Sequence, residues 1–164
     1  MNRLQQKLKE NRNRRSRDEF LRTLDERSRV LLSGTQFTSD TQVLRFAAFP
    51  TWNMDADCQT TTRGTVPGWQ NLQFPTWQSL IEHLQGLSVP SEAEGYFFID
   101  TDGPYYLLTG CAFLSIIGSM DRYAIEHKHY DFGWIGAGND FGIIVEFDHT
   151  SFCRNEFELS IWGM

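Results

Sequence analysis

The residues best suited to chemistry lie between positions 125 and 149, a stretch with three histidines, four glycines and several acidic residues. If residues 122 to 131 form a strand, His127, His129 and Asp131 project from one face, because strand side chains alternate. Two imidazoles and a carboxylate are suitable ligands for zinc and would serve a small metal-dependent hydrolase or lyase. The remaining ligand or base would come from Asp148, Glu146 or His149.

The same stretch also fits an ordinary solvated sheet face, where polar side chains near an edge prevent unwanted strand pairing. We favour this interpretation, in which the protein holds no cofactor. The glycines do not indicate a phosphate-binding loop, because such a loop precedes a helix, whereas here the strand-like segment FGIIVEF follows. The chain also lacks G-x-S-x-G, Walker A and H-E-x-x-H motifs. Enzyme activity is therefore not indicated by any complete motif.

Alternation along residues 142 to 148 predicts a strand with an acidic side. Ile143, Val145 and Phe147 share one face, and Ile144, Glu146 and Asp148 share the other. We call the second side the acidic face and expect it to include Glu156 and Glu158 from the last strand. Aromatic side chains near this face would anchor a partner. The candidate partner-binding residues are Tyr130, Asp131, Trp134, Glu146, Asp148, Glu156, Glu158 and Trp162.

Charge is divided unequally along the chain, whose formal net charge is -6. Residues 1 to 32 carry ten Lys and Arg against five Asp and Glu, or +5, so the remaining residues carry -6 - 5 = -11. An acidic body is repelled by nucleic acid and attracted to basic proteins. Nucleic acid is therefore a poor candidate partner, even though the first residues are basic.

The pattern of apolar residues predicts an α+β fold. Leu and Phe positions after the sequence Ser16-Arg17-Asp18-Glu19, which has the form of a capping box, predict a helix over residues 17 to 32. Thr76 is a good N-cap for a second helix that ends near Gly86. The expected strands cover Val43–Phe49, Tyr96–Asp100, Tyr105–Ile117, Arg122–Tyr130, Gly142–Asp148 and Glu156–Trp162.

These elements predict a single α+β domain over residues 17 to 164, with an antiparallel sheet of about five to six strands that ends in a meander. Residues 1 to 16 form a basic N-terminal arm, either flexible or helical. No apolar run is long enough to cross a membrane, and the first residues do not resemble a secretory signal. We expect a cytoplasmic protein.

The acidic face and its aromatic surroundings favour a binding protein that captures a basic protein partner. A small, acidic, cytoplasmic α+β protein of bacterial type suits the task of neutralising a toxin, such as a basic nuclease, in the manner of an immunity protein. The alternative is the metal-dependent enzyme that uses His127, His129 and Asp131.

Overall fold

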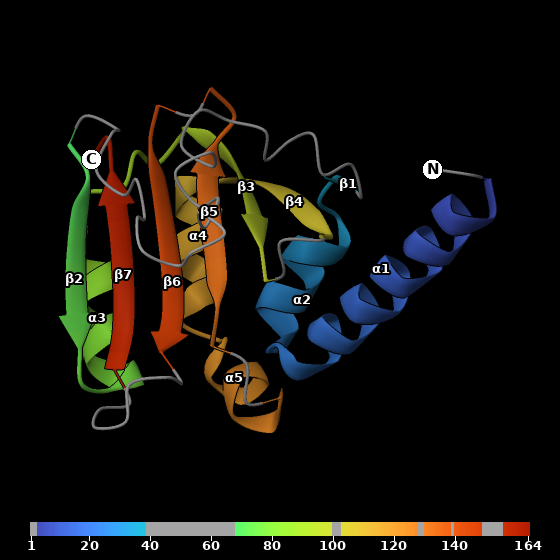
Figure 1. Cartoon of the computed structure of the whole chain (residues 1–164), viewed down its shortest axis with the longest axis horizontal. Coiled ribbons are helices and arrows are strands. Elements are labelled where there is room, and N and C mark those ends of the chain that lie inside the picture. The colour runs from blue at the N-terminus through green and yellow to red at the C-terminus, as the bar shows by residue number, and fades with distance from the viewer. Residues whose placement is uncertain (1–2, 39–67, 100–102, 128–129, 139, 149–155) are drawn as a thin grey trace, which may run out of the picture.

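The computed structural model describes residues 3–38, 68–99, 103–127, 130–138, 140–148 and 156–164 (Figure 1). Within them the helices are α1 (Arg3–Thr23), α2 (Glu26–Ser33), α3 (Trp77–Gly86), α4 (Gly110–Ile117) and α5 (Asp121–His127). The strands are β1 (Phe37–Thr38), β2 (Gln70–Phe74), β3 (Glu94–Phe98), β4 (Tyr105–Thr109), β5 (Phe132–Gly136), β6 (Gly142–Asp148) and β7 (Glu156–Trp162). The predicted strand Val43–Phe49 lies outside the described residues.

The described strands form one antiparallel sheet in the order β1-β4-β3-β5-β6-β7-β2. Helices α3 and α4 pack behind this sheet, while α1 and α2 lie beyond its β4 side (Figure 1). The structure thus confirms the α+β class with an antiparallel sheet. The described residues contain seven strands and five helices, rather than five to six strands and two helices.

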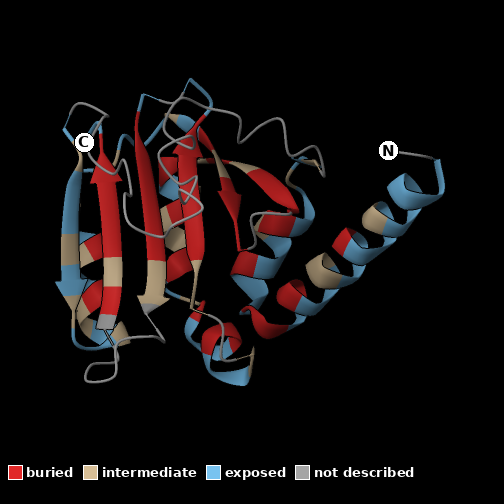
Figure 2. Cartoon of the chain, in the orientation of Figure 1, coloured by how far each residue is buried: buried red, intermediate tan, exposed pale blue. Residues whose placement is uncertain are grey.

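The main hydrophobic core lies between the sheet and the helices, and it is rich in aromatic rings. Phe97 of β3, Phe113 of α4 and Trp134 of β5 are all fully buried. Phe113 and Trp134 stack with ring centroids 4.9 Å apart. Burying each such side chain contributes roughly 1.5–3 kcal/mol to folding. Figure 2 shows that burial extends across the central strands and onto the inner sides of the helices.

The first helix differs from the prediction at both ends. It begins at Arg3, and Ser16 lies inside it rather than at a cap. It ends at Thr23, because Asp25 caps a separate helix, α2, by accepting a hydrogen bond from the Ser28 backbone amide. The predicted helix over residues 17 to 32 is therefore wrong as a single element. The residues before Ser16 are good helix formers, so helix extends through the N-terminal arm.

Two predicted strands are wrong because helices occupy much of their length. Tyr105–Ile117 is strand only as far as Thr109, whose side chain then caps α4 by accepting a hydrogen bond from the Ala112 amide. Arg122–Tyr130 contains most of α5, in which Arg122 and Glu126 form an i,i+4 salt bridge. Short apolar runs cannot be assigned to strand or helix by periodicity alone.

The middle helix and the last two strands agree with their predictions. Thr76 caps α3 by accepting a hydrogen bond from the Ser79 amide, and Gly86 is the last residue of the helix. β6 and β7 have the predicted bounds. Among the described residues, no helix is both long enough and apolar enough to cross a membrane.

Candidate functional site

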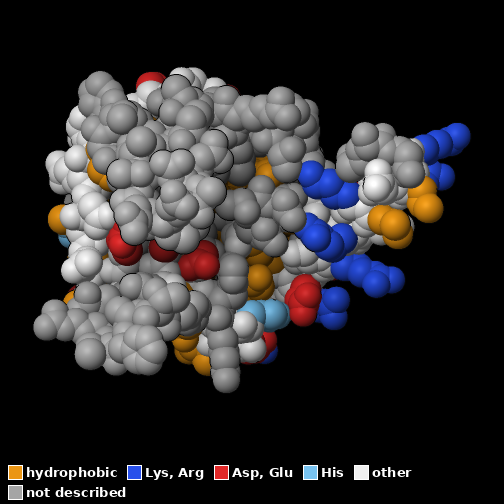
Figure 3. Space-filling view, in the orientation of Figure 1, with side chains coloured by type: hydrophobic (Ala, Val, Ile, Leu, Met, Phe, Trp, Pro, Cys, Tyr) orange, Lys and Arg blue, Asp and Glu red, His pale blue; other side chains and the backbone are white. Residues whose placement is uncertain are grey.

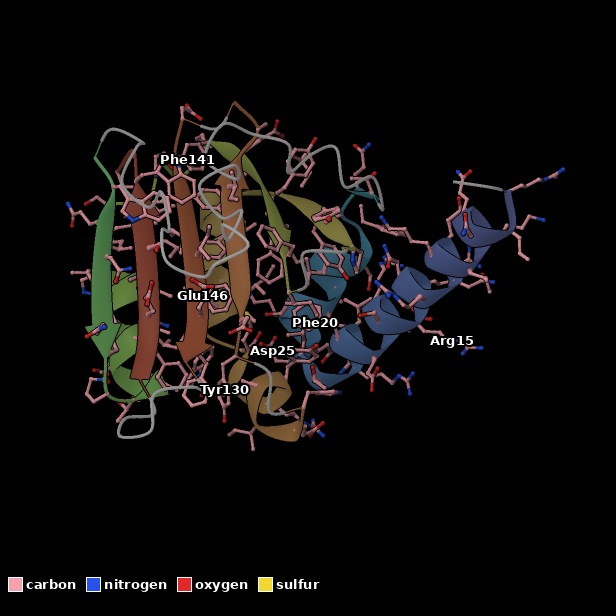
Figure 4. The ribbon with its side chains drawn as sticks, in the orientation of Figure 1. Arg15, Phe20, Asp25, Tyr130, Phe141 and Glu146 are labelled. Carbon is pink, nitrogen blue, oxygen red and sulfur yellow. The ribbon has the colours of Figure 1, made fainter. Side chains whose placement is uncertain are left out.

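The acidic face lies on the side of the sheet opposite the main core. Ile143 and Val145 of β6 are buried in that core, whereas Ile144 belongs to a separate cluster on the other side. Because strand side chains alternate, Glu146 lies on the same side as Ile144. Glu146 is labelled over the front of the sheet in Figure 4. The apolar residues Ile143, Ile144 and Val145 therefore alternate between the two sides of β6 as predicted, and Glu146 lies on the side away from the main core.

Strand pairing brings the acidic positions of β6 and β7 directly opposite one another. Glu146 pairs with Glu158, and the backbone register places Asp148 opposite Glu156 two residues further along. Two carboxylates directly opposite each other make this part of the sheet strongly negative. Figure 3 shows the acidic side chains gathered over the sheet and the Lys and Arg side chains gathered along α1.

The outermost strand β2 adds polar groups to this face. Asn71 lies opposite Ser160, and its side-chain amide donates a hydrogen bond of 2.6 Å to the Glu158 carboxylate. This bond holds the Glu158 carboxylate at the boundary between β7 and β2. Asn71 was absent from the predicted site because 87 positions separate it from Glu158, and no local pattern indicates such a pairing.

Aromatic rings cover the upper part of the same side of the sheet. Trp162 stacks on Trp69 with ring centroids 5.0 Å apart and an interplanar angle of 6°. Trp162 is almost fully buried, and Trp69 and Tyr96 are half-buried beside it. Trp162 therefore supports this face from within and does not project from it. Trp69 and Tyr96 are the partly exposed rings, and neither was predicted as a site residue.

Three buried polar atoms of this region have no hydrogen-bond partner among the described residues. They are the Ser160 hydroxyl and the indole nitrogens of Trp69 and Trp162. A buried donor without a partner costs about 1–3 kcal/mol.

Trp134 does not belong to the candidate surface. It is fully buried in the main core, on the side of the sheet away from the carboxylates, and its indole nitrogen donates to the Leu108 carbonyl at 3.3 Å. Its predicted role as a partner anchor is therefore corrected to that of a core residue. The flanking glycines do not expose it, because β5 is a central strand with neighbours on both sides.

Tyr130 and Asp131 have separate places at the lower end of the sheet. The Tyr130 ring packs against Trp77, Phe147 and Phe157, on the helix side. The Asp131 carboxylate accepts a hydrogen bond of 2.8 Å from the backbone amide of Phe147, the residue after Glu146. Asp131 thus brings another carboxylate beside the acidic face, whereas Tyr130 stabilises the core beneath it.

The predicted metal ligands are not arranged along one strand. His127 is the last residue of α5, where its ring stacks on Tyr123 and its Nε2 lies 3.2 Å from the Glu19 carboxylate. Asp131 belongs to the segment that enters β5, and His129 lies outside the described residues. No group of three potential ligands suited to a metal ion occurs in the described part of the chain. His127 and Asp131 therefore do not lie on the single strand that the metal-site prediction assumed. The metal site itself remains a prediction.

Comparison of the chain with protein-family models, curated proteins and solved structures found no match. The function of the protein must therefore be inferred from the geometry of the acidic face.

Proposed function

We propose that the protein is a binding protein that captures a basic protein partner through its acidic face. The observation that carries this proposal is the direct opposition of Glu146 and Glu158 across β6 and β7. This arrangement concentrates negative charge on one side of the sheet, and cationic side chains from a partner would be attracted to it.

The surroundings of the carboxylates support a protein partner rather than a small ion. Trp69 and Tyr96 provide half-buried aromatic surface on the same side of the sheet. Tyrosine and tryptophan are enriched at the centres of protein interfaces, where they contribute much of the binding energy.

A toxin with nuclease activity fits these requirements, because a groove that holds nucleic acid must carry positive charge. An acidic protein bound in that groove would block access of the substrate. The protein would then act as an immunity-type inhibitor in the cytoplasm, the compartment expected from the sequence. Opposite charge would also speed the encounter between the two proteins.

The proposal can be tested by capture from a nuclease-treated lysate of the native source. The tagged wild-type protein is compared with the double variant Glu146→Lys/Glu158→Lys, and with Glu92→Lys as a control. Glu92 is an exposed residue in the turn before β3, so its replacement changes charge away from the acidic face.

We expect the wild-type protein and the control to retain one basic protein in near-stoichiometric amount, and the double variant to lose it. The captured protein is then purified and mixed with each variant to show that binding is direct. Equal capture by the double variant, with its fold confirmed by circular dichroism, would refute the assignment of the face.

A further inference from the structure

Strand β2 forms one edge of the sheet and pairs with β7 (Figure 1). All five of its residues, Gln70–Phe74, have partners in β7 in a continuous register without a bulge. No strand in the described part of the chain pairs with the other side of β2. The opposite edge strand, β1, has two residues. The sheet thus has one short edge and one long edge, and β2 is the long one.

β2 lacks the features that usually keep an edge strand from pairing with another chain. Proteins protect such edges with charged side chains, an internal proline, a bulge or a very short strand. The stretch Gly68–Ile81, which includes β2, carries no charged residue. The side chains of Gln70, Asn71 and Gln73 are exposed. An open edge of this kind is suited to the addition of a further strand.

The hydrogen bonds of the sheet show which backbone groups of β6 face which neighbour. In an antiparallel ladder, alternate residues of a strand direct both N–H and C=O to the same neighbouring strand. The Gly136 amide of β5 donates to the Phe141 carbonyl at 3.0 Å, so odd-numbered positions along β6 face β5 and even-numbered positions face β7. The Phe147 amide agrees with this assignment, because it donates to Asp131, just before β5.

The same alternation continues through β7 to β2. Even-numbered residues of β6 pair with even-numbered residues of β7, so the odd-numbered residues of β7 direct their backbone groups to β2. Leu159 of β7 pairs with Leu72 of β2, so the even-numbered residues of β2 use their backbone groups on β7. The backbone N–H and C=O groups of Asn71 and Gln73 therefore point out of the sheet, at equal distances on either side of Leu72.

We infer that β2 pairs with the β2 strand of a second copy of the chain, antiparallel and centred on Leu72. In this register Asn71 of each copy lies opposite Gln73 of the other. Each of these two pairs exchanges two hydrogen bonds, so the outward backbone groups of both residues are satisfied in both copies. The edge is uncharged, so the pairing brings no like charges of β2 together.

The side chains of β2 suit the same register. Leu72 and Phe74 pack against the main core, and both are half-buried. In the dimer the two Leu72 side chains meet as a non-hydrogen-bonded pair, the arrangement in which opposite side chains lie closest. Helix α3 lies behind β2, with the rings of Phe74 and His83 5.0 Å apart, so the two copies of α3 would lie side by side behind the joined sheet.

Two-fold pairing also explains why the two edges of the sheet differ. Because both copies use the same surface, the assembly closes at two copies. The joined sheet then ends at both sides in the two-residue strand β1. The two-fold axis runs perpendicular to the sheet, so both acidic faces lie on the same side of the dimer. The inference does not rest on the proposed function, because it uses the backbone edge of β2 and not the carboxylates.

Replacement of the outward backbone donor tests the pairing in the full-length protein. Gln73→Pro removes an amide that points away from β7, so the fold should survive. Gln73→Lys keeps the amide and adds the charge that protects natural edges. Gln6→Lys makes the same substitution at an exposed position of α1, beyond the opposite side of the sheet. Leu72→Pro removes an amide that faces β7 and should destabilise the fold, as measured by urea unfolding.

Sedimentation velocity over a concentration series measures the dimer. We expect wild type and Gln6→Lys to dimerise equally, and the dimer dissociation constants of Gln73→Pro and Gln73→Lys to be at least about tenfold higher. A wild-type protein that is monomeric at every concentration, or a Gln73→Lys protein that dimerises as tightly as wild type, would overturn the inference. A monomeric wild type that loses a captured protein on Gln73→Pro would assign the edge to a foreign strand instead.

Cross-linking tests the register in a protein whose native cysteines are replaced by serine. Opposite residues of a non-hydrogen-bonded pair have Cα atoms about 4.5 Å apart, within the range that a disulfide bridges. Leu72→Cys should therefore form a covalent dimer on oxidation with copper phenanthroline. Gln70→Cys is the matched control and should stay uncross-linked, because Gln70 lies opposite Phe74 of the other copy. Cross-linking of Gln70→Cys and not of Leu72→Cys would refute pairing centred on Leu72.

Discussion

Glu146 of β6 lies directly opposite Glu158 of β7, on the side of the sheet that faces away from the packed helices. Asn71 of β2 donates a hydrogen bond to the Glu158 carboxylate, so one member of the pair is held in place from the neighbouring strand. The two carboxylates make this part of the sheet strongly negative, which suits the binding of a cationic partner.

Replacing Glu146 with glutamine should impair capture. The variant Glu146→Gln removes one charge of the opposed pair and leaves the Asn71 to Glu158 hydrogen bond intact. We expect capture of a basic partner to weaken, because a neutral amide attracts cationic side chains less than a carboxylate does. Glu92→Gln in the exposed turn is the control and should bind like wild type, and urea unfolding checks that both variants are folded. Equal capture by Glu146→Gln and wild type would contradict the assignment of Glu146 to the binding surface.

Trp134 and Trp69 should respond in opposite ways to replacement by phenylalanine. Trp134→Phe leaves the buried Leu108 carbonyl without its indole donor, so we expect a loss of about 1–3 kcal/mol in unfolding free energy. Capture by the folded variant should be unchanged. Trp69→Phe replaces a half-buried ring on the same side of the sheet as Glu146 with a smaller one, and it should weaken capture with little loss of stability. Unfolding and binding titrations measure the two effects. Weakened capture by Trp134→Phe with little loss of stability would show that Trp134 contributes to the interface.

Gly142 should not tolerate a side chain. It lies opposite Trp162, and a methyl group at Gly142 would overlap the Trp162 ring. We expect Gly142→Ala to lower the free energy of unfolding by about 1–3 kcal/mol, because the ring must move from its stack on Trp69. Gly86→Ala at the end of α3 is the matched control, since nothing lies within 4 Å of the added methyl. Chemical denaturation of both variants provides the measurement, and equal stability would contradict the packing.

Asp25 should contribute to stability in a pH-dependent way. The hydrogen bond from the Ser28 backbone amide lowers the pKa of Asp25 below its usual value of 3.8. A lowered pKa in the folded protein stabilises it above pH 3.8, and this contribution is lost as pH falls through the lowered pKa. At neutral pH, Asp25→Ala should cost about 0.5–2 kcal/mol through loss of the cap.

The difference between wild type and Asp25→Ala should therefore narrow in acid. Thr76→Ala removes an uncharged cap from α3, so its cost should not change with pH. Urea unfolding at neutral pH and at about pH 3 measures both effects. A constant cost for Asp25→Ala across this range would show that the charge of Asp25 does not contribute.

The elements that could be predicted from sequence are those whose signals lie within a few residues. α3 has its N-cap at Thr76 and its buried residues Leu80, Ile81 and Leu84 at helical spacing. β6 alternates between residues of the main core, Ile143 and Val145, and residues of the other side, Ile144 and Glu146. The sequence of α4 shows no such alternation of apolar and polar positions, because the segment around it is apolar throughout. The local signal for a helix was the cap at Thr109.

The candidate site could be predicted in part, again from signals that lie within a few residues of one another. Alternation indicated which carboxylates share a side of each strand, and the meander made β6 and β7 neighbours. It could not indicate that β2 joins β7, which brings Asn71 and Trp69 to the same surface. His127 and Asp131 were wrongly assigned to one strand. Helix α5, which ends at His127, buries only Tyr123 and Ala124, so its sequence has too few apolar positions to show helical spacing.

Because α1 is anchored at its C-terminal end, charge is distributed unevenly over the molecule even when no partner is bound. A helix segment of charge +5 is held at one side of a body that is otherwise acidic, so the centres of positive and negative charge do not coincide. The protein is therefore a permanent electric dipole. In the field of a charged macromolecule it would turn before contact, presenting the sheet to a cation and the helix to an anion.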